Sequence, residues 1–145
     1  MLKDILEQYE RGPVVDQCVD VLNAEVASKK GLSGLAVKGG FKVIAAVKPG
    51  FIRAVIDGLL DDFVEELEPF YADWSSGGSG DFGSYLVSNS AEVADGLLGV
   101  TDRRAEGTEH GTAKKAYLKL RPSAVEHVSA SLPRVGALMN SYLEG

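Results

Sequence analysis

Residue types that support metal or redox chemistry are scarce in this sequence. It contains one cysteine, Cys18, and two histidines, His110 and His127. A single cysteine excludes an internal disulfide and any site built from several thiolates, and it favours a reducing compartment, so we expect a cytoplasmic protein. Neither histidine has a glutamate three residues earlier, as di-iron helical bundles require, because Gly107 and Ala124 occupy those positions. We therefore expect no metal site and no cofactor.

Long apolar runs are also missing. Charged residues interrupt every apolar stretch of the N-terminal sequence M-L-K-D-I-L-E-Q-Y-E, and no uncharged run approaches the ~20 residues that a membrane-spanning helix needs. The net charge of -6 argues against broad binding to a nucleic-acid backbone, which requires clustered positive potential. The composition thus predicts a soluble protein with no membrane span and no nucleic-acid partner.

Alternating strand patterns and internal repeats are absent too, whereas helical periodicity runs through nearly the whole chain. The clearest amphipathic segment begins at Phe51 and continues to Leu67. Further segments with helical spacing are residues 2–10, 13–30, 33–47, 90–100, 113–120 and 122–142. The sequence predicts an all-α bundle of about six to seven helices, and its length of 145 residues fits a single domain over 1–145.

Five prolines and one glycine–serine run are the expected helix breaks. Pro69 is predicted to end the longest helix, and residues 75–81, which read S-S-G-G-S-G-D, are predicted to form a flexible loop. This loop is the only candidate internal boundary. Pro122 is predicted to open the last helical region, and Pro133 to kink or split it.

Charge is sorted along the chain. Residues 29–53 carry six basic side chains and no acid, while residues 54–102 carry eleven acids and no Lys or Arg. Such segregation favours a non-enzymatic interaction protein that meets a protein partner, or a second copy of itself, through complementary surfaces. Neutralisation between neighbouring helices of one molecule is the stronger interpretation of the charge sorting, and exposed pairs of this kind contribute about 0 to 1 kcal/mol each.

Three glycines interrupt the basic segment where a helix is expected. Gly34, Gly39 and Gly40 each disfavour a helix interior by roughly 0.5 to 1 kcal/mol relative to alanine, so a packing or ligand contact should explain them. One interpretation is a close helix crossing. The spacing does not make a phosphate-binding loop, because Gly40 stands where the lysine would be needed.

A second interpretation of the basic segment is a binding site for a small anionic ligand. Ser33 is predicted to cap the helix, and Lys29 and Lys30 lie next to its start, where free amides and the positive end of the helix attract anions. Lys38 and Lys42 follow one turn apart.

Aromatic residues gather around the glycine–serine loop. Trp74 and Tyr85 lie on either side of it, and four of the other nine aromatic residues are close in sequence, namely Phe63, Phe70, Tyr71 and Phe82. They could form a small satellite core or the wall of a ligand pocket. The alternative function is therefore a module that binds an anionic or lipid-like molecule between the basic helix and this aromatic cluster.

Acid–base chemistry has little support. Glu109 and His110, with Glu106 and Asp102 upstream, form the best cluster, but they lie in a polar turn that is more typical of solvated surface. We assign no catalytic residue.

The stretch A-E-V-A-S-K-K-G-L-S-G-L-A-V-K-G-G-F-K-V-I-A-A-V-K-P-G-F-I, residues 24–52, resembles an uncharacterised bacterial domain family of unknown function. The similarity extends into D-D-F-V-E-E-L-E-P-F-Y-A-D-W. It implies a small stand-alone helical protein and carries over no substrate, cofactor or site residue.

Overall fold

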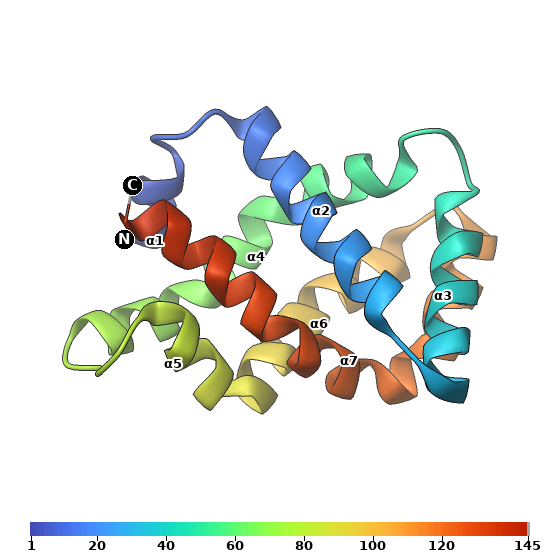
Figure 1. Cartoon of the computed structure of the whole chain (residues 1–145). Helices are drawn as coiled ribbons and strands as arrows, with labels where there is room; N and C mark the ends of the chain where they lie inside the picture. Colours follow the sequence, from blue (N-terminus) through green and yellow to red (C-terminus); the bar gives the residue numbers. More distant parts are fainter. Residues whose placement is uncertain (145) are drawn as a thin grey trace.

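Seven helices account for nearly all of residues 1–144, which are the residues that the computed structural model describes. No strand occurs among them, so the all-α prediction is confirmed. Figure 1 shows their arrangement. The helices are α1 (Leu2–Leu6), α2 (Arg11–Ser28), α3 (Gly31–Ala45), α4 (Phe51–Ser75), α5 (Phe82–Ser88), α6 (Ser90–Gly107) and α7 (Gly111–Glu144).

Four of the helices form a ring. α2 contacts α4, α4 contacts α6, α6 contacts α7 and α7 contacts α2. The two diagonal pairs, α2 with α6 and α4 with α7, make no close backbone contact within the described residues. Side chains alone therefore fill the centre of the ring, and this is where an internal space can persist.

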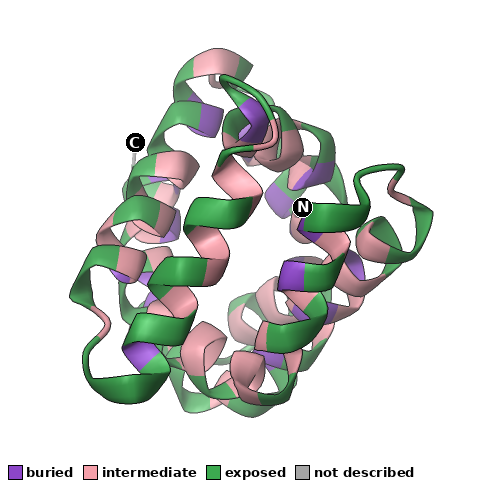
Figure 2. Cartoon of the chain, turned by 90° about the vertical axis from the view of Figure 1, so that its right-hand side faces the viewer, coloured by how far each residue is buried: buried purple, intermediate pink, exposed green. Residues whose placement is uncertain are grey.

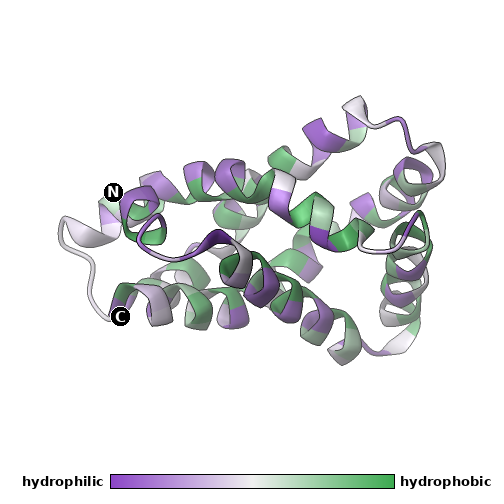
Figure 3. Cartoon of the chain, turned by 90° about the horizontal axis from the view of Figure 1, so that it is seen from above, coloured by the Kyte–Doolittle hydropathy of each residue, from purple (hydrophilic) through white to green (hydrophobic). Residues whose placement is uncertain are grey.

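The best-packed core lies at one end of the ring, where α1 and α5 cover α4 and α7. Leu2, Phe82, Leu86 and Leu132 are completely buried there. Figure 3 shows that hydrophobic and hydrophilic residues are interspersed along the helices, as expected for helices that bury one face.

α5 and α7 cross at a pair of glycines that bring the two backbones together. A Cβ atom placed on Gly136 would lie 2.7 Å from the Cα atom of Gly83, and one placed on Gly83 would lie 2.7 Å from the carbonyl of Gly136. The Gly83 amide also donates a hydrogen bond to the Asn140 side chain at 2.9 Å. Only glycine fits at this crossing.

The prolines break fewer helices than the sequence predicts. Pro69 lies inside α4, which continues to Ser75, so the prediction that it ends the longest helix is wrong. Pro122 and Pro133 both lie inside α7, so the predicted helices at 113–120 and 122–142 are one element. A proline removes one amide donor and bends the backbone, and packing on both sides can hold the helix together. In Figure 1, α7 accordingly changes direction between its start beside α3 and its end near the N-terminus.

α3 begins two residues earlier than predicted. Its N-cap is Lys30 and its first residue is Gly31, so Ser33 lies in the first turn instead of capping the helix. Gly40 packs against the side chain of Leu120 on α7, in agreement with a close helix crossing, whereas a Cβ atom on Gly39 would meet nothing within 4 Å.

The glycine–serine segment is a tight connection between α4 and α5. Its Gly80 carbonyl accepts a hydrogen bond from the Trp74 indole at 3.1 Å, and the Gly78 amide donates to the Trp74 carbonyl at 2.7 Å. Leu67 before the segment and Phe82 after it belong to the same core cluster.

Candidate functional site

An apolar pocket occupies the centre of the ring formed by α2, α4, α6 and α7. Its volume is about 220 Å³. α2 contributes Cys18, Val21 and Leu22, and α4 contributes Ile56, Leu60 and Phe63. The remaining walls are made by α1, α6 and α7, including Leu97, Val128, Val135 and Leu138.

Many of the pocket's aliphatic walls remain partly exposed. Leu22, Ile56, Leu60 and Val135 are all only half-buried, although each lies on the inner stripe of its helix. Helix stripes normally bury such side chains against each other, so the pocket is a place where the ring does not close completely. It therefore communicates with the surface.

The polar groups on the walls are mostly satisfied by their own helices. The Ser131 hydroxyl donates to the Val128 carbonyl at 2.6 Å, and the Thr101 hydroxyl donates to the Leu98 carbonyl at 3.0 Å. The wall thus presents methyl and methylene groups to whatever fills the space.

Cys18 faces this apolar space from α2. Burial raises the pKa of its thiol to about 11, because a thiolate would lose hydration among aliphatic side chains. It is the only cysteine of the sequence, and it is uncharged at neutral pH.

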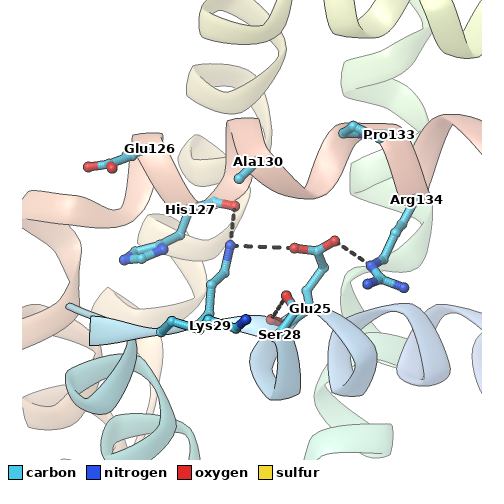
Figure 4. Close-up of a pocket in the computed structure, with 9 residues that line it drawn as sticks. Glu25, Ser28, Lys29, Glu126, His127, Ala130, Pro133 and Arg134 are labelled. Atoms are coloured by element: carbon cyan, nitrogen blue, oxygen red, sulfur yellow. Dashed lines mark hydrogen bonds and ion pairs between the residues drawn. The ribbon is translucent and has the colours of Figure 1, made fainter. Parts of the chain in front are cut away.

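Glu25 marks one end of the pocket and is the only charged residue among the described residues that line it. Its side chain is 11% exposed. The carboxylate accepts a hydrogen bond from Arg134 Nε at 2.7 Å and lies 3.4 Å from Lys29 Nζ. Figure 4 shows Glu25 between these two cations, one from the end of α2 and one from α7. The carboxylate at the end of the pocket is therefore flanked by two cations that lie outside the pocket lining.

Glu25 is shared with an open surface groove of about 630 Å³ between the end of α2 and α7. Lys30, Glu126 and His127 also line the groove. Glu25 is therefore the residue at which the apolar pocket and the surface groove meet.

The predicted anion-binding residues divide into two groups. Lys29 is not a solvated lysine, because its side chain is 11% exposed and it bridges Glu25 and the His127 carbonyl, at 3.4 Å from each. Lys30 is exposed at the groove, and Ser33 Oγ lies 2.8 Å from His127 Nε2. Within the described residues no carboxylate orients that imidazole, so the Ser33–His127 pair lacks the third member of a nucleophilic triad.

Lys38 and Lys42 belong to the second group. Both are exposed on α3, and neither lines the groove or the apolar pocket. They do not contribute to the site around Glu25.

The aromatic cluster lies elsewhere. The Trp74 ring packs at a tilt against those of Phe82 and Tyr71, with ring centroids 5.5 Å and 5.9 Å apart, whereas Tyr85 forms no aromatic pair among the described residues. α3 makes no contact with α5, and Figure 1 places them on opposite sides of the molecule. The structure does not bring the basic helix and the aromatic cluster together, so Trp74 and Tyr85 do not share a pocket with Lys29, Lys30 or Ser33.

The acid–base cluster is dispersed. Asp102 accepts hydrogen bonds from Arg121 at 2.9 Å and Tyr117 at 2.5 Å, and these bonds hold the pKa of its carboxyl below the usual value. Burial raises the pKa of Tyr117 to about 12, with the Asp102 hydrogen bond as a further cause. His110 packs edge-on against Phe51 at 5.1 Å. Among the described residues, no group of His, Cys, Asp or Glu side chains is arranged to hold a metal ion.

Sequence reasoning missed Glu25 and Arg134, and it treated Cys18 only as a core residue. A signal for Glu25 exists, because it follows Leu22 by three residues and Cys18 by seven and so shares their apolar face. A carboxylate in such a stripe requires a buried partner. Arg134 is 109 residues away, and no local pattern links it to Glu25.

Comparison with known proteins gives one match. A family model described as a family of unknown function (DUF6918) matches residues 2–143, which confirms the resemblance recognised over residues 24–52. No curated protein and no solved structure matches the chain significantly.

Proposed function

The chain belongs to DUF6918, a family of unknown function, and we propose from its geometry that it is a binding module for a small lipid-like molecule. The observation that carries the proposal is the apolar pocket of about 220 Å³ at the centre of the helix ring. The apolar part of the ligand occupies this pocket, and its polar end lies beside Glu25.

An unfilled pocket of this size is unfavourable. Atoms that line an empty space lose dispersion contacts, and residual volume within a core lowers stability. Water compensates poorly, because the walls offer it few hydrogen-bond partners. An apolar ligand removes the penalty and gains dispersion contacts.

The pocket's dimensions favour a short chain or a small ring system. Apolar cavities of about 150 Å³ already bind molecules such as benzene, and drug-sized pockets begin at about 300 Å³. The pair of cations around Glu25 favours an anionic polar end, because Lys29 and Arg134 together exceed the single carboxylate charge. A short fatty acid combines both properties and is a suitable probe.

Calorimetric titration with saturated fatty acids of increasing chain length tests the proposal. We expect the binding free energy to improve by about 0.8 kcal/mol per added methylene until the pocket is full, and then to level off. The matching alkanols should bind more weakly, because they lack the carboxylate. Absence of binding by the whole series would contradict the proposal.

Variants that fill the pocket separate this site from adsorption elsewhere. Val135→Phe adds volume to a half-buried wall of α7 and should weaken fatty-acid binding at least tenfold while keeping the fold. Val87→Phe is the matched control, because Val87 is 42% exposed on α5 and lies outside the pocket. Equal binding by both variants would place the ligand elsewhere.

Association through oppositely charged surfaces is the second candidate, and it has less support. Arg11 pairs with Asp57 at 2.6 Å and with Asp61 at 3.0 Å, and Arg53 pairs with Asp16 at 2.7 Å. These contacts join α2 to α4 inside one molecule, so part of the charge segregation is neutralised without a partner.

A further inference from the structure

α3 carries apolar residues on both sides and yet lies at the edge of the molecule. Gly34 is its only buried residue, and Figure 2, which looks onto this side, shows exposed positions along much of the helix at the front. Helices that are apolar all round are normally buried, so the exposed side of α3 is unusual for a surface that meets only water.

The outer face of α3 is the side opposite the crossing of Gly40 with Leu120 of α7, and its last residues, Val43 and Ala46, also border an open hollow beside the start of α7. At 100° per residue its members fall within one sector of the helix, opposite Phe41 and Val37. Leu32 is 88% exposed, Leu35 is 66% exposed and Val43 is 42% exposed. The outer face comprises Leu32, Leu35, Ala36, Gly39, Val43 and Ala46, all of which are exposed.

Lysines border the outer face. Lys38 and Lys42 lie along its edge one turn apart, and both are exposed. Lys30 precedes the helix and Lys48 follows it, and both are exposed as well. No acidic residue occurs between 29 and 53, so nothing on this segment cancels their charge.

We propose that the outer face of α3 docks on the surface of an anionic lipid bilayer. The helix lies parallel to the membrane, the leucine and valine side chains enter the headgroup region, and the bordering lysines meet lipid phosphates. This combination of aliphatic residues with lysines on one surface helix is typical of interfacial helices. No helix in residues 1–144 is both long and apolar enough to span a bilayer, so the contact is confined to the surface.

The composition favours a lipid surface over a protein partner. Protein interfaces are enriched in Tyr, Trp and Arg and depleted in Lys. The outer face, in contrast, has no aromatic residue, and the charged residues at its border are all lysines. Lysine stems can lie along an apolar surface while the ammonium groups reach the phosphates. The proposal goes beyond the ligand pocket, because docking requires no ligand in the pocket.

Vesicle flotation with the full chain tests the proposal. We expect the protein to float with vesicles of equal parts phosphatidylcholine and phosphatidylglycerol and not with pure phosphatidylcholine, and to dissociate as salt is raised. Absence of flotation with the anionic vesicles at low salt would overturn it.

Paired variants locate the contact. Lys38→Gln with Lys42→Gln should lower the vesicle partition coefficient about thirtyfold, and Leu35→Ser about tenfold or more. The matched controls on α7 are Lys115→Gln with Lys119→Gln, and Leu118→Ser, since Leu118 is 55% exposed and lies two residues from the Leu120 that contacts α3. These controls should retain wild-type partitioning.

Two outcomes would refute the assignment to α3. One is an equal loss of partitioning in the α3 variants and the α7 controls, which would mean diffuse charge attraction. The other is self-association without vesicles: a sedimenting mass that doubles in the wild type but not in Leu35→Ser would assign the outer face to a second copy of the chain.

Discussion

At the scale of single residues, the pocket is defined by what surrounds Cys18 and Glu25. Both lie on the same face of α2, one in an apolar wall and the other between two cations. A neutral thiol and a paired carboxylate are what an apolar interior tolerates. Cys18 is therefore a probe of the apolar wall, and Glu25 marks the charged end of the pocket.

Cys18 gives a direct prediction about pH. Because burial raises the thiol pKa from 9.0 to about 11, alkylation by a neutral thiol reagent should remain slow until the pH approaches 11. Between pH 9 and pH 11 the Cys18 thiol stays protonated in the folded protein, whereas it ionises in the unfolded protein. The contribution of Cys18 to stability is therefore present below pH 9 and is lost as the pH rises from 9 to 11. Alkylation rates across this range, followed by mass spectrometry, check the prediction.

The same thiol reports on pocket occupancy. A fatty acid that fills the pocket should slow alkylation of Cys18 further at fixed pH. Free cysteine in the same solution is the control for consumption of the reagent by the fatty acid. Unchanged protection at saturating fatty acid would mean that the ligand does not lie against α2.

At the scale of helices, glycines mark the place where two helix backbones come close together. Prolines, in contrast, do not mark the ends of the helices. Gly83 and Gly136 permit α5 to lie on the backbone of α7. Pro69, Pro122 and Pro133 all lie within helices, because the packing of α4 and α7 on their neighbours outweighs one lost backbone hydrogen bond.

The glycine crossing predicts a clear difference between substitutions. Gly136→Ala places a Cβ atom against the Gly83 backbone and should destabilise the protein by about 1 to 3 kcal/mol, the usual range for overpacking. Gly39→Ala is the control, because its Cβ atom meets nothing within 4 Å and should stabilise α3 by roughly 0.5 to 1 kcal/mol. Urea denaturation measures both. Equal effects at the two positions would mean that the α5–α7 crossing is looser than described.

At the scale of the whole molecule, the ring leaves its centre to side chains and closes its end with the α1–α5 core. We propose that residues 1–145 form one cooperative domain, because α7 contacts five other helices and the core cluster joins segments on both sides of the glycine–serine connection. Circular dichroism and the fluorescence of Trp74, the sole tryptophan, should then give coincident urea transitions. Two separate midpoints would identify the connection after α4 as a real boundary.

Much of the fold was accessible from local patterns. The long amphipathic helix after Gly50 and the stripe of α2 follow from apolar spacing alone. The glycines of α3 pointed to a close crossing, and Gly40 lies against Leu120. The candidate site was predicted only in part: Lys29 belongs to it, but its closest carboxylate was overlooked.

The sequence alone determined the helical class, the apolar stripe of each helix and the basic character of the α3 segment, because these depend on residues within one or two turns of each other. Only the tertiary structure decided that α2 and α6, like α4 and α7, stay apart, that Arg134 reaches Glu25 across 109 residues, and that α3 and α5 lie on opposite sides of the molecule. These contacts depend on how the apolar stripes of helices that are distant in sequence pack against each other. The periodicity of one helix does not indicate which other helix it packs against. The pocket exists because four stripes meet without filling the centre that they enclose.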